Sequence, residues 1–195
     1  MPTLSTLFIP DISGFTTFVR STEQEHARHI ISELIGLIIE SGAPYFKVAE
    51  VEGDAVFFYR EDEAYSISRI TSISQEIYGR FHAHLQQYEQ RRICSCGACS
   101  TAANLRLKFI AHLGEIGFID VNGGLKPFGA AVIQVHRLLK NNVDSSEYVL
   151  FSQNFLEDNS LDFDGEGVYQ DESLGDIPYS FTLIKDWEVP KSASL

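Results

Sequence analysis

Apolar residues follow two spacings along this chain, one typical of buried strands and the other typical of helices. The apolar run at residues 4–10 predicts a buried strand. Apolar side chains then recur at helical spacing over residues 30–38, which predicts an amphipathic helix. Thr22 and Glu25 are spaced as a capping box before that helix, and Gly42 predicts its end.

The next segments predict a hairpin and a long helix. Residues 45–50 and 55–59 are rich in β-forming side chains and flank a turn at Gly53, so Asp54 is expected just past that turn. Residues 63–89 have the spacing of a helix. Its predicted buried face consists of Ile67, Ile70, Ile73, Ile77, Phe81 and Leu85.

The second half of the chain predicts further strands and one more helix. Residues 105–112 and 116–121 are expected to form the two arms of a second hairpin, with a glycine between them. A helix is expected over residues 129–140 and a strand over residues 148–151. Residues 179–184 predict a strand at the edge of the sheet.

The order of these elements, β-α-β-β-α-β-β-α-β, predicts the fold class. It favours an α+β sandwich in which helices pack on one side of a mostly antiparallel sheet. The length of 195 residues and the absence of a repeat or a linker predict one domain. The acidic stretch at residues 158–176 is expected to form a partly mobile flap.

Charge and hydropathy narrow the class of partner. The formal net charge of −12 argues against nucleic acid or an anionic membrane as partner. A nucleotide held through a metal ion is compatible with that charge. The chain shows no signal peptide at its start and no run of roughly 20 apolar residues, so a cytosolic protein without a membrane span is expected.

The three cysteines lie within one short loop, and an odd, clustered set does not predict a disulfide framework. They are Cys94, Cys96 and Cys99. With a histidine such as His82, His84 or His112, they would complete a structural tetrahedral Zn²⁺ site. The alternatives are a reduced thiol loop and a redox-sensitive one. His112 itself is expected in the core, because apolar residues flank it.

Two carboxylates stand at the ends of predicted strands. Asp11 and Asp54 could converge there to hold Mg²⁺ or Mn²⁺. Alternatively, Asp11 caps a turn and Asp54 closes a hairpin. The backbone amides of residues 12–15 precede a helix, and Gly14 would let the chain approach an anion closely, with Phe15 beside it. An ordinary turn between a strand and a helix is the alternative.

Four separated segments, taken together, resemble the class III adenylyl/guanylyl (nucleotidyl) cyclases. They are residues 8–16 (FIPDISGFT), 51–55 (VEGDA), 107–116 (LKFIAHLGEI) and 128–132 (FGAAV), the last followed by Arg137. Their order and spacing fit that family over residues 4–152. The cysteine cluster before the third segment also resembles an uncharacterised, cyclase-related bacterial family.

The resemblance implies a ferredoxin-like cyclase fold and a homodimer that binds a nucleoside triphosphate at the subunit interface. One subunit would supply Asp11, Asp54 and the backbone carbonyl of Ile12 to two Mg²⁺ or Mn²⁺ ions. The partner would supply Arg137 to stabilise the transition state. Attack of the ribose 3′-oxygen on the α-phosphate would give a 3′,5′-cyclic nucleotide and pyrophosphate.

The resemblance also aligns two residues with the positions that select the base. Glu50 stands where adenylyl cyclases have lysine and guanylyl cyclases have glutamate, and Lys126 stands where the former have aspartate. Glutamate accepts hydrogen bonds and lysine only donates them, so this pair suits guanine better than adenine. GTP is therefore expected over ATP, with CTP as a third candidate. The alternative is a salt bridge between the two side chains, with no ligand.

Two positions depart from the family pattern. Ile133 stands where the family usually has an asparagine that orients the ribose, and isoleucine cannot make that hydrogen bond. The phosphate-binding lysine of the family falls near Tyr148, and Lys140 does not match its position. These departures leave a nucleotide-binding module without turnover, or a dimerisation module without nucleotide, as alternatives to an enzyme.

Overall fold

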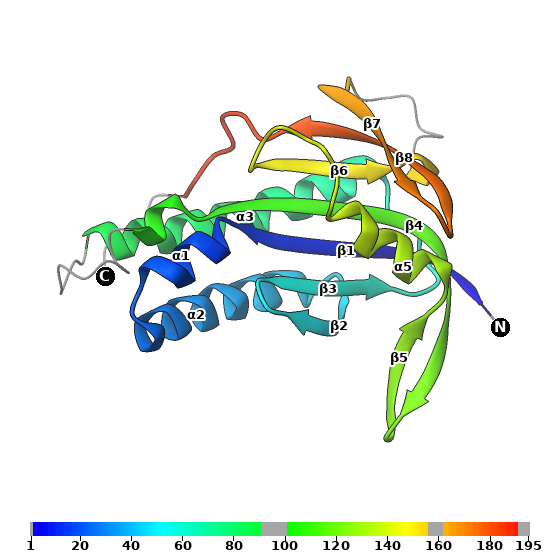
Figure 1. Ribbon diagram of the computed structural model, residues 1–195, viewed down its shortest axis with the longest axis horizontal. Coiled ribbons are helices and arrows are strands. Elements are labelled where there is room, and N and C mark those ends of the chain that lie inside the picture. Colours follow the sequence, from blue (N-terminus) through cyan, green and yellow to red (C-terminus); the bar gives the residue numbers. More distant parts are fainter. Residues whose placement is uncertain (1, 91–100, 156–161, 191–195) are drawn as a thin grey trace.

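A twisted sheet forms the centre of the molecule, and helices cover both of its faces (Figure 1). The computed structural model describes residues 2–90, 101–155 and 162–190. Within them the sheet has the order β2-β3-β1-β4-β6-β8-β7, and β5 pairs with the far end of β4. All pairings are antiparallel except that between β4 and β6. The predicted α+β class with a mostly antiparallel sheet is confirmed.

The strands and helices have the following bounds. The strands are β1 (Thr3–Ser13), β2 (Lys47–Glu52), β3 (Ala55–Arg60), β4 (Arg106–Val121), β5 (Gly124–Phe128), β6 (Tyr148–Ser152), β7 (Gly165–Asp171) and β8 (Gly175–Leu183). The α-helices are α1 (Phe15–Ser21), α2 (Gln24–Gly42), α3 (Ile67–Gln90) and α5 (Ala130–Leu138). Two short 3₁₀ turns are η1 (Ala102–Asn104) and η2 (Gln153–Phe155).

The central strand β1 divides the core into two layers, because successive side chains point to opposite faces of the sheet. Phe8 belongs to the layer under α2 and α3, and its neighbours Leu7 and Ile9 belong to the layer under α5. The prediction that all helices pack on one side is therefore wrong. The nearly continuous run of apolar residues in β1 indicates a strand that is buried on both faces.

Helix α3 packs on the sheet through the face that its periodicity predicted. All six apolar residues of that face are buried: Ile67, Ile70, Ile73, Ile77, Phe81 and Leu85. The predicted capping box before α2 is wrong, since α2 begins at Gln24 after Glu23, whose side chain makes no capping bond. The preceding helix α1 occupies this segment, and Thr22 is the extended residue between the two helices.

The strand β4 is one long strand and not the two hairpin arms that the sequence predicted. Its first part pairs with β1, and its last part, from Gly117 onward, pairs with β5. Gly114 does not end the strand but lets α5 approach it. A Cβ atom at Gly114 would lie 2.6 Å from the Cβ of Ala131 on α5, which is too close for any other residue.

The acidic C-terminal part contributes a strand to the sheet. It forms β7, which pairs with β8 along its length. The expected partly mobile flap at residues 158–176 stays a prediction, although residues 165–171 within it form this paired strand. The strand β8 lies between β6 and β7, so it is not the edge strand that was predicted. Its buried residues Ile177 and Tyr179 join the layer under α5.

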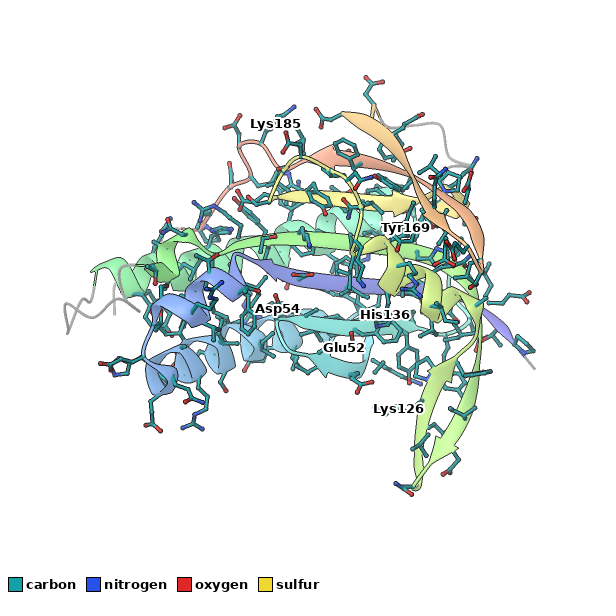
Figure 2. The ribbon with its side chains drawn as sticks, viewed as in Figure 1. Glu52, Asp54, Lys126, His136, Tyr169 and Lys185 are labelled. Atoms are coloured by element: carbon teal, nitrogen blue, oxygen red, sulfur yellow. The ribbon has the colours of Figure 1, made fainter. Side chains whose placement is uncertain are left out.

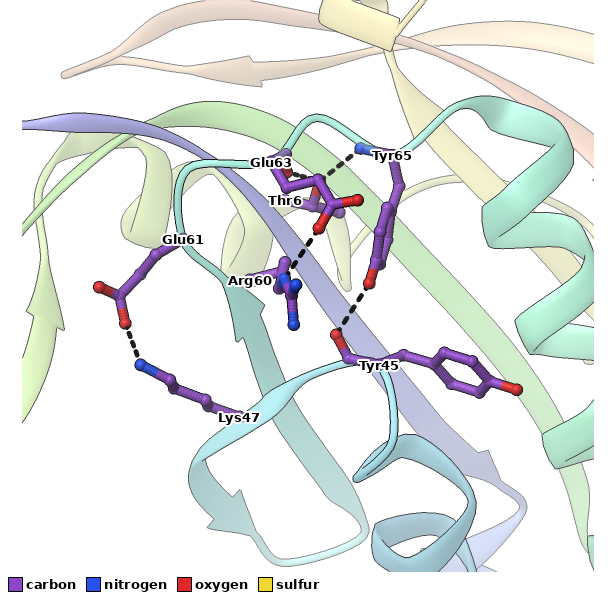
Figure 3. Close-up of polar contacts among 7 residues, drawn as sticks. All are labelled: Thr6, Tyr45, Lys47, Arg60, Glu61, Glu63 and Tyr65. Carbon is purple, nitrogen blue, oxygen red and sulfur yellow. Dashed lines mark hydrogen bonds and ion pairs between the residues drawn. The ribbon is translucent and has the colours of Figure 1, made fainter.

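Polar contacts fix the connection from β3 to α3 against β1 (Figure 3). The hydroxyl of Thr6 donates to the carbonyl of Glu63 at 2.8 Å and accepts from the backbone amide of Tyr65 at 3.0 Å. The Tyr65 hydroxyl donates to the carbonyl of Tyr45 at 3.1 Å. These bonds pair partly buried backbone groups of the loop.

Candidate functional site

Asp11 and Asp54 are brought together by the pairing of β1 with β3. Asp11 lies opposite Ala55, the residue that follows Asp54. The backbone amide of Ile12 also donates to the carbonyl of Asp54 at 3.0 Å, which ties the β2–β3 turn to β1. The two carboxylates therefore belong to one site at the end of this strand pair.

Lys108 on β4 lies beside this pair of carboxylates. Its Nζ is 3.5 Å from Oδ2 of Asp11, and both side chains are largely buried. Burial raises the pKa of Asp11; Lys108 lowers that pKa, and Asp54 raises it further. Burial also raises the pKa of Asp54, against its own backbone hydrogen bond and the charge of Lys108. The positive charge of Lys108 therefore offsets only part of the effect of burial on the pKa values of the two carboxyl groups.

This electrostatic imbalance fits a divalent cation. Hard cations prefer carboxylate and carbonyl oxygens, and Mg²⁺ commonly binds through one or two carboxylates plus substrate phosphates. In the described part of the chain, no group of three or more His, Cys, Asp or Glu side chains converges to hold a metal by itself. The donor set of Asp11, Asp54 and a backbone carbonyl therefore fits an ion that shares its ligands with a phosphate.

The turn after β1 has the geometry that its glycine predicted. Gly14 adopts a left-handed φ of 87°, which favours glycine, and it precedes the short helix α1. Beside this turn, a groove of about 700 Å³ lies between α1, α2 and the β2–β3 turn. Phe15, Val51 and Gly53 are among the residues that line it. Gly53, the residue before Asp54, is the part of this lining nearest in sequence to the paired carboxylates.

Glu50 on β2 and Lys126 on β5 form an ion pair between the two strands. Lys126 Nζ lies 3.9 Å from Oε2 of Glu50 and donates to the carbonyl of Ala49 at 2.8 Å. The salt bridge between Glu50 and Lys126, which was the alternative to a base-binding role, therefore forms. The side chains remain 44% and 55% exposed, so the pair is weakly held and open to a ligand.

Arg137 lies in the last turn of α5 and contacts β7. Its Nε is 3.0 Å from Oδ2 of Asp171. The amides of Ser173 and Leu174 lower the pKa of Asp171, and Arg137 lowers it further. Asp171 is thus a fixed anion at the β7–β8 turn, and it holds Arg137 toward β7 and away from the strands that carry Asp11 and Asp54.

Comparison with known proteins places the chain in a family. Residues 31–148 match the model of the family described as "protein of unknown function (DUF2652)", which is more than half of the chain. This chain belongs to the DUF2652 family. It is also 33% identical, over 122 residues, to the uncharacterized protein Rv2561/Rv2562 of Mycobacterium tuberculosis. The match spans 63% of this chain and little more than half, 57%, of that protein.

Solved structures with a similar fold are nucleotidyl cyclases. The guanylyl cyclase Cya2 is similar with a TM-score of 0.70 at 14% identity, over 98% of both chains. The adenylyl cyclase CyaB from P. aeruginosa has a TM-score of 0.70 at 14% identity, over 96% of this chain and 98% of that one. The guanylate cyclase domain of RhGC from Catenaria anguillulae, in complex with GTP, has a TM-score of 0.63 at 15% identity, over 94% and 98%. This DUF2652 chain therefore has a cyclase-like fold.

The two departures from the cyclase pattern have clear positions in the DUF2652 chain. Ile133 lies on α5 with half of its side chain exposed. Tyr148 is buried, its hydroxyl is paired with the side chain of Asn141, and burial raises its pKa to about 12. A buried tyrosine of this kind cannot replace a phosphate-binding lysine.

The predicted Zn²⁺ site falls outside the described residues, because Cys94, Cys96 and Cys99 lie in the segment 91–100. Among its candidate histidines, His82 lies 3.0 Å from Glu147 and His84 lies 3.2 Å from Glu33. The prediction that His112 lies in the core is confirmed. It is buried, and burial lowers its pKa to about 4.

Sequence reasoning missed two functional candidates of the DUF2652 chain. The third cyclase-like segment contains Lys108, and the antiparallel register of β1 with β4 could have placed it opposite Asp11. The pairing of Glu52 with His136 had no local signal, because 84 positions separate the two residues. The described helices also lack any span long and apolar enough to cross a membrane.

Proposed function

We propose that this chain is a metal-dependent nucleotidyl cyclase. It converts a nucleoside triphosphate, with GTP favoured, to a 3′,5′-cyclic nucleotide and pyrophosphate at the interface of a homodimer. The observation that supports this most strongly is the convergence of Asp11 and Asp54, crowded and only partly compensated, on a sheet with a cyclase-like fold.

Asp11, Asp54 and the backbone carbonyl of Ile12 would hold Mg²⁺ or Mn²⁺. When bound, two such ions stabilise the attacking and leaving oxygens and make the ribose 3′-hydroxyl more acidic. The chain itself fixes the carboxylates through the β1–β3 pairing and Lys108. The turn at Gly14 and Phe15 would position the phosphates beside them.

Arg137 would act on the substrate held by the partner's aspartates. Its guanidinium suits the negative charge that develops on the α-phosphate. Within one protomer Asp171 holds this side chain toward β7, and the side chain of Arg137 remains 45% exposed. An arginine held at the surface in this way is available to a second subunit.

The homodimer is supported by an apolar arm. The end of β4 and β5 project from the body of the molecule as a hairpin (Figure 1). Large apolar side chains are exposed on this arm and on α5: Ile119, Val121, Leu125, Phe128 and Ile133. A hairpin on its own is marginally stable in water, and exposed apolar patches mark interaction sites. The arm would therefore pack on the partner subunit.

Charging the arm is expected to break the dimer. Leu125 and Phe128 are 66% and 60% exposed, so replacing both with glutamate leaves the core intact and places two charges in the interface. The variant L125E/F128E should sediment as a monomer at micromolar concentration, whereas the wild type sediments as a dimer. The matched control is Leu4→Glu, at an exposed apolar position on β1. An arm variant with the mass of the wild type would contradict the proposed interface.

The preference for GTP is supported by the Glu50–Lys126 pair. Guanine presents N1–H and N2–H₂ donors, which suit the carboxylate of Glu50. Its O6 acceptor suits the ammonium of Lys126, whereas adenine offers the opposite pattern at these positions. Both side chains are exposed enough to exchange their mutual contact for a base.

Exchanging the charges of this pair is expected to exchange the preferred base. The double variant Glu50→Lys, Lys126→Asp should lower the ratio of kcat/KM for GTP over ATP by about tenfold or more, because one discriminating hydrogen bond contributes at least that factor. Initial rates with GTP, ATP and CTP measure this ratio. A wild type that prefers ATP would overturn the assignment of the pair.

A second candidate function is supported by Ile133. An apolar side chain, half exposed at the position that would face the ribose, is compatible with a cyclase-like domain that binds a nucleotide without turning it over. Metal-dependent binding of GTP without any cyclic product would favour this function. The absence of binding would leave a dimerisation module.

A further inference from the structure

His136 on α5 is held between two hydrogen-bond acceptors. Its Nδ1 lies 2.7 Å from the carbonyl of Val132, and its Nε2 lies 3.0 Å from Oε1 of Glu52 on β2. Its ring also contacts the ring of Phe57 edge-on, at a centroid distance of 4.9 Å. The imidazole is therefore fixed from three directions.

The carboxylate of Glu52 is an acceptor, so Nε2 of His136 is the donor in the contact between them. This hydrogen bond holds the carboxylate of Glu52 in one orientation. Among the residues that the structure describes, no protein group bonds to the other oxygen of Glu52, Oε2. That oxygen is oriented and open to a donor from a ligand.

Glu52 lies beside one of the residues assigned to the base of the nucleotide. Glu52 follows Glu50 by two residues on β2, and both pair with residues of β3 whose side chains face α5. Glu52 and Glu50 therefore share the face on which Lys126 lies. Figure 2 labels Glu52, His136 and Lys126. His136 precedes Arg137 directly. The open oxygen of Glu52 thus lies on the same face as the base-selecting pair, on a residue that is held by the helix that also carries Arg137.

We propose that Glu52 binds a hydroxyl group of the nucleotide's ribose and that His136 positions Glu52 for this role. The ribose is the part of a nucleotide between its base and its phosphates, and it presents hydroxyl donors. Carboxylates are established acceptors for such hydroxyls in nucleotide-binding sites. Ile133, one helical turn before His136, offers no hydrogen bond to the sugar.

The test compares ribose with deoxyribose in the full-length protein. Isothermal titration calorimetry measures the Kd of GTP, 2′-deoxyGTP and 3′-deoxyGTP, with Ca²⁺ in place of Mn²⁺ to slow turnover. The wild type is expected to bind GTP about 10- to 100-fold more tightly than one of the deoxy analogues, the range for a hydrogen bond to a charged group. Glu52→Ala should weaken GTP binding by that factor and leave the same analogue's Kd unchanged.

A positioning role for His136 has its own signature. His136→Ala should reduce the ratio of the two Kd values, whereas a residue that only stabilises the fold would lower the melting temperature without changing that ratio. His136→Gln retains a donor for Glu52 and should recover part of the ratio. Thermal melting of each variant shows whether it is folded. Glu61→Gln, at a glutamate that pairs with Lys47, is the matched control and should keep the wild-type ratio.

The outcomes separate this inference from the cyclase function on which it rests. Equal Kd values for GTP and both analogues in the wild type would overturn the role of Glu52, even if cyclic product forms. An equal loss of all three affinities in Glu52→Ala would overturn it as well. Discrimination that depends on Glu52, without cyclic product, would support the ribose site and refute the cyclase. No binding of any nucleotide would overturn both.

Discussion

Asp54→Asn is expected to lower the rate of cyclic nucleotide formation by about a thousandfold or more. Removing one preorganised charge-stabilising group costs on the order of 10² to 10³ in kcat, and Asp54 would contribute to the binding of both metal ions. Asparagine keeps the size of the side chain and its carbonyl oxygen but loses the negative charge. Initial rates with GTP and Mn²⁺, with the product quantified by mass spectrometry, measure the effect.

The same substitution is not expected to weaken the fold. Burial raises the pKa of Asp54 above its ordinary value of 3.8, so the folded carboxyl ionises at a higher pH than the unfolded one. Its contribution to stability therefore falls as pH rises from the unfolded pKa through the folded pKa, and it is least favourable at neutral pH. Asp54→Asn should melt no lower than the wild type at pH 7, and any gain should vanish at acid pH.

The matched control for this loss is Asp144→Asn, at an exposed aspartate in the loop before β6. It should keep the wild-type rate. An Asp54→Asn protein that retains a tenth of the wild-type rate, or a control that loses activity equally, would contradict the assignment of Asp54 as a metal ligand.

Phe8→Ala is expected to have the largest effect on stability, a loss of about 3–5 kcal/mol in the free energy of unfolding. Phe8 is fully buried in β1, at the centre of an aromatic cluster. Its ring centroid lies 5.1 Å from that of Phe46, 5.8 Å from that of Phe109 and 6.4 Å from that of Phe58. Alanine would leave a cavity that strands from three parts of the chain cannot close. Urea denaturation at fixed protein concentration measures the loss.

A surface substitution provides the control for Phe8→Ala. Val168 on the edge strand β7 is 46% exposed, so Val168→Ala should change the free energy of unfolding by no more than about 0.5 kcal/mol. If Phe8→Ala lowers the free energy of unfolding by less than about 1 kcal/mol, the aromatic cluster around Phe8 is not a main source of stability.

Local patterns predicted the elements whose signals lie within one segment. The periodicity of α3, the glycine turn between β2 and β3 and the start of α5 after Gly129 all follow from short stretches of sequence. Predictions failed where contacts between distant parts of the chain determine the local structure. Gly114 looks like a turn residue but is needed for the approach of Ala131, and β7 is acidic and glycine-rich but gains a partner in β8.

The candidate site shows the same division. The positions of Asp11 and Asp54 followed from motifs that resemble the cyclases, but their convergence depends on the register of β1 with β3. The position of Lys108 beside Asp11 depends in the same way on the register of β1 with β4. The Glu52–His136 pair joins β2 to α5 across 84 positions, so only the folded chain shows it.

The most direct measurement of the central claim is an incubation of the purified wild-type protein with each of the four nucleoside triphosphates and Mn²⁺, with products identified by mass spectrometry. A 3′,5′-cyclic nucleotide and pyrophosphate are expected in equal amounts, with cyclic GMP formed fastest and with the rate lowered by about a thousandfold or more in Asp54→Asn. No cyclic product from any of the four substrates would contradict the cyclase function.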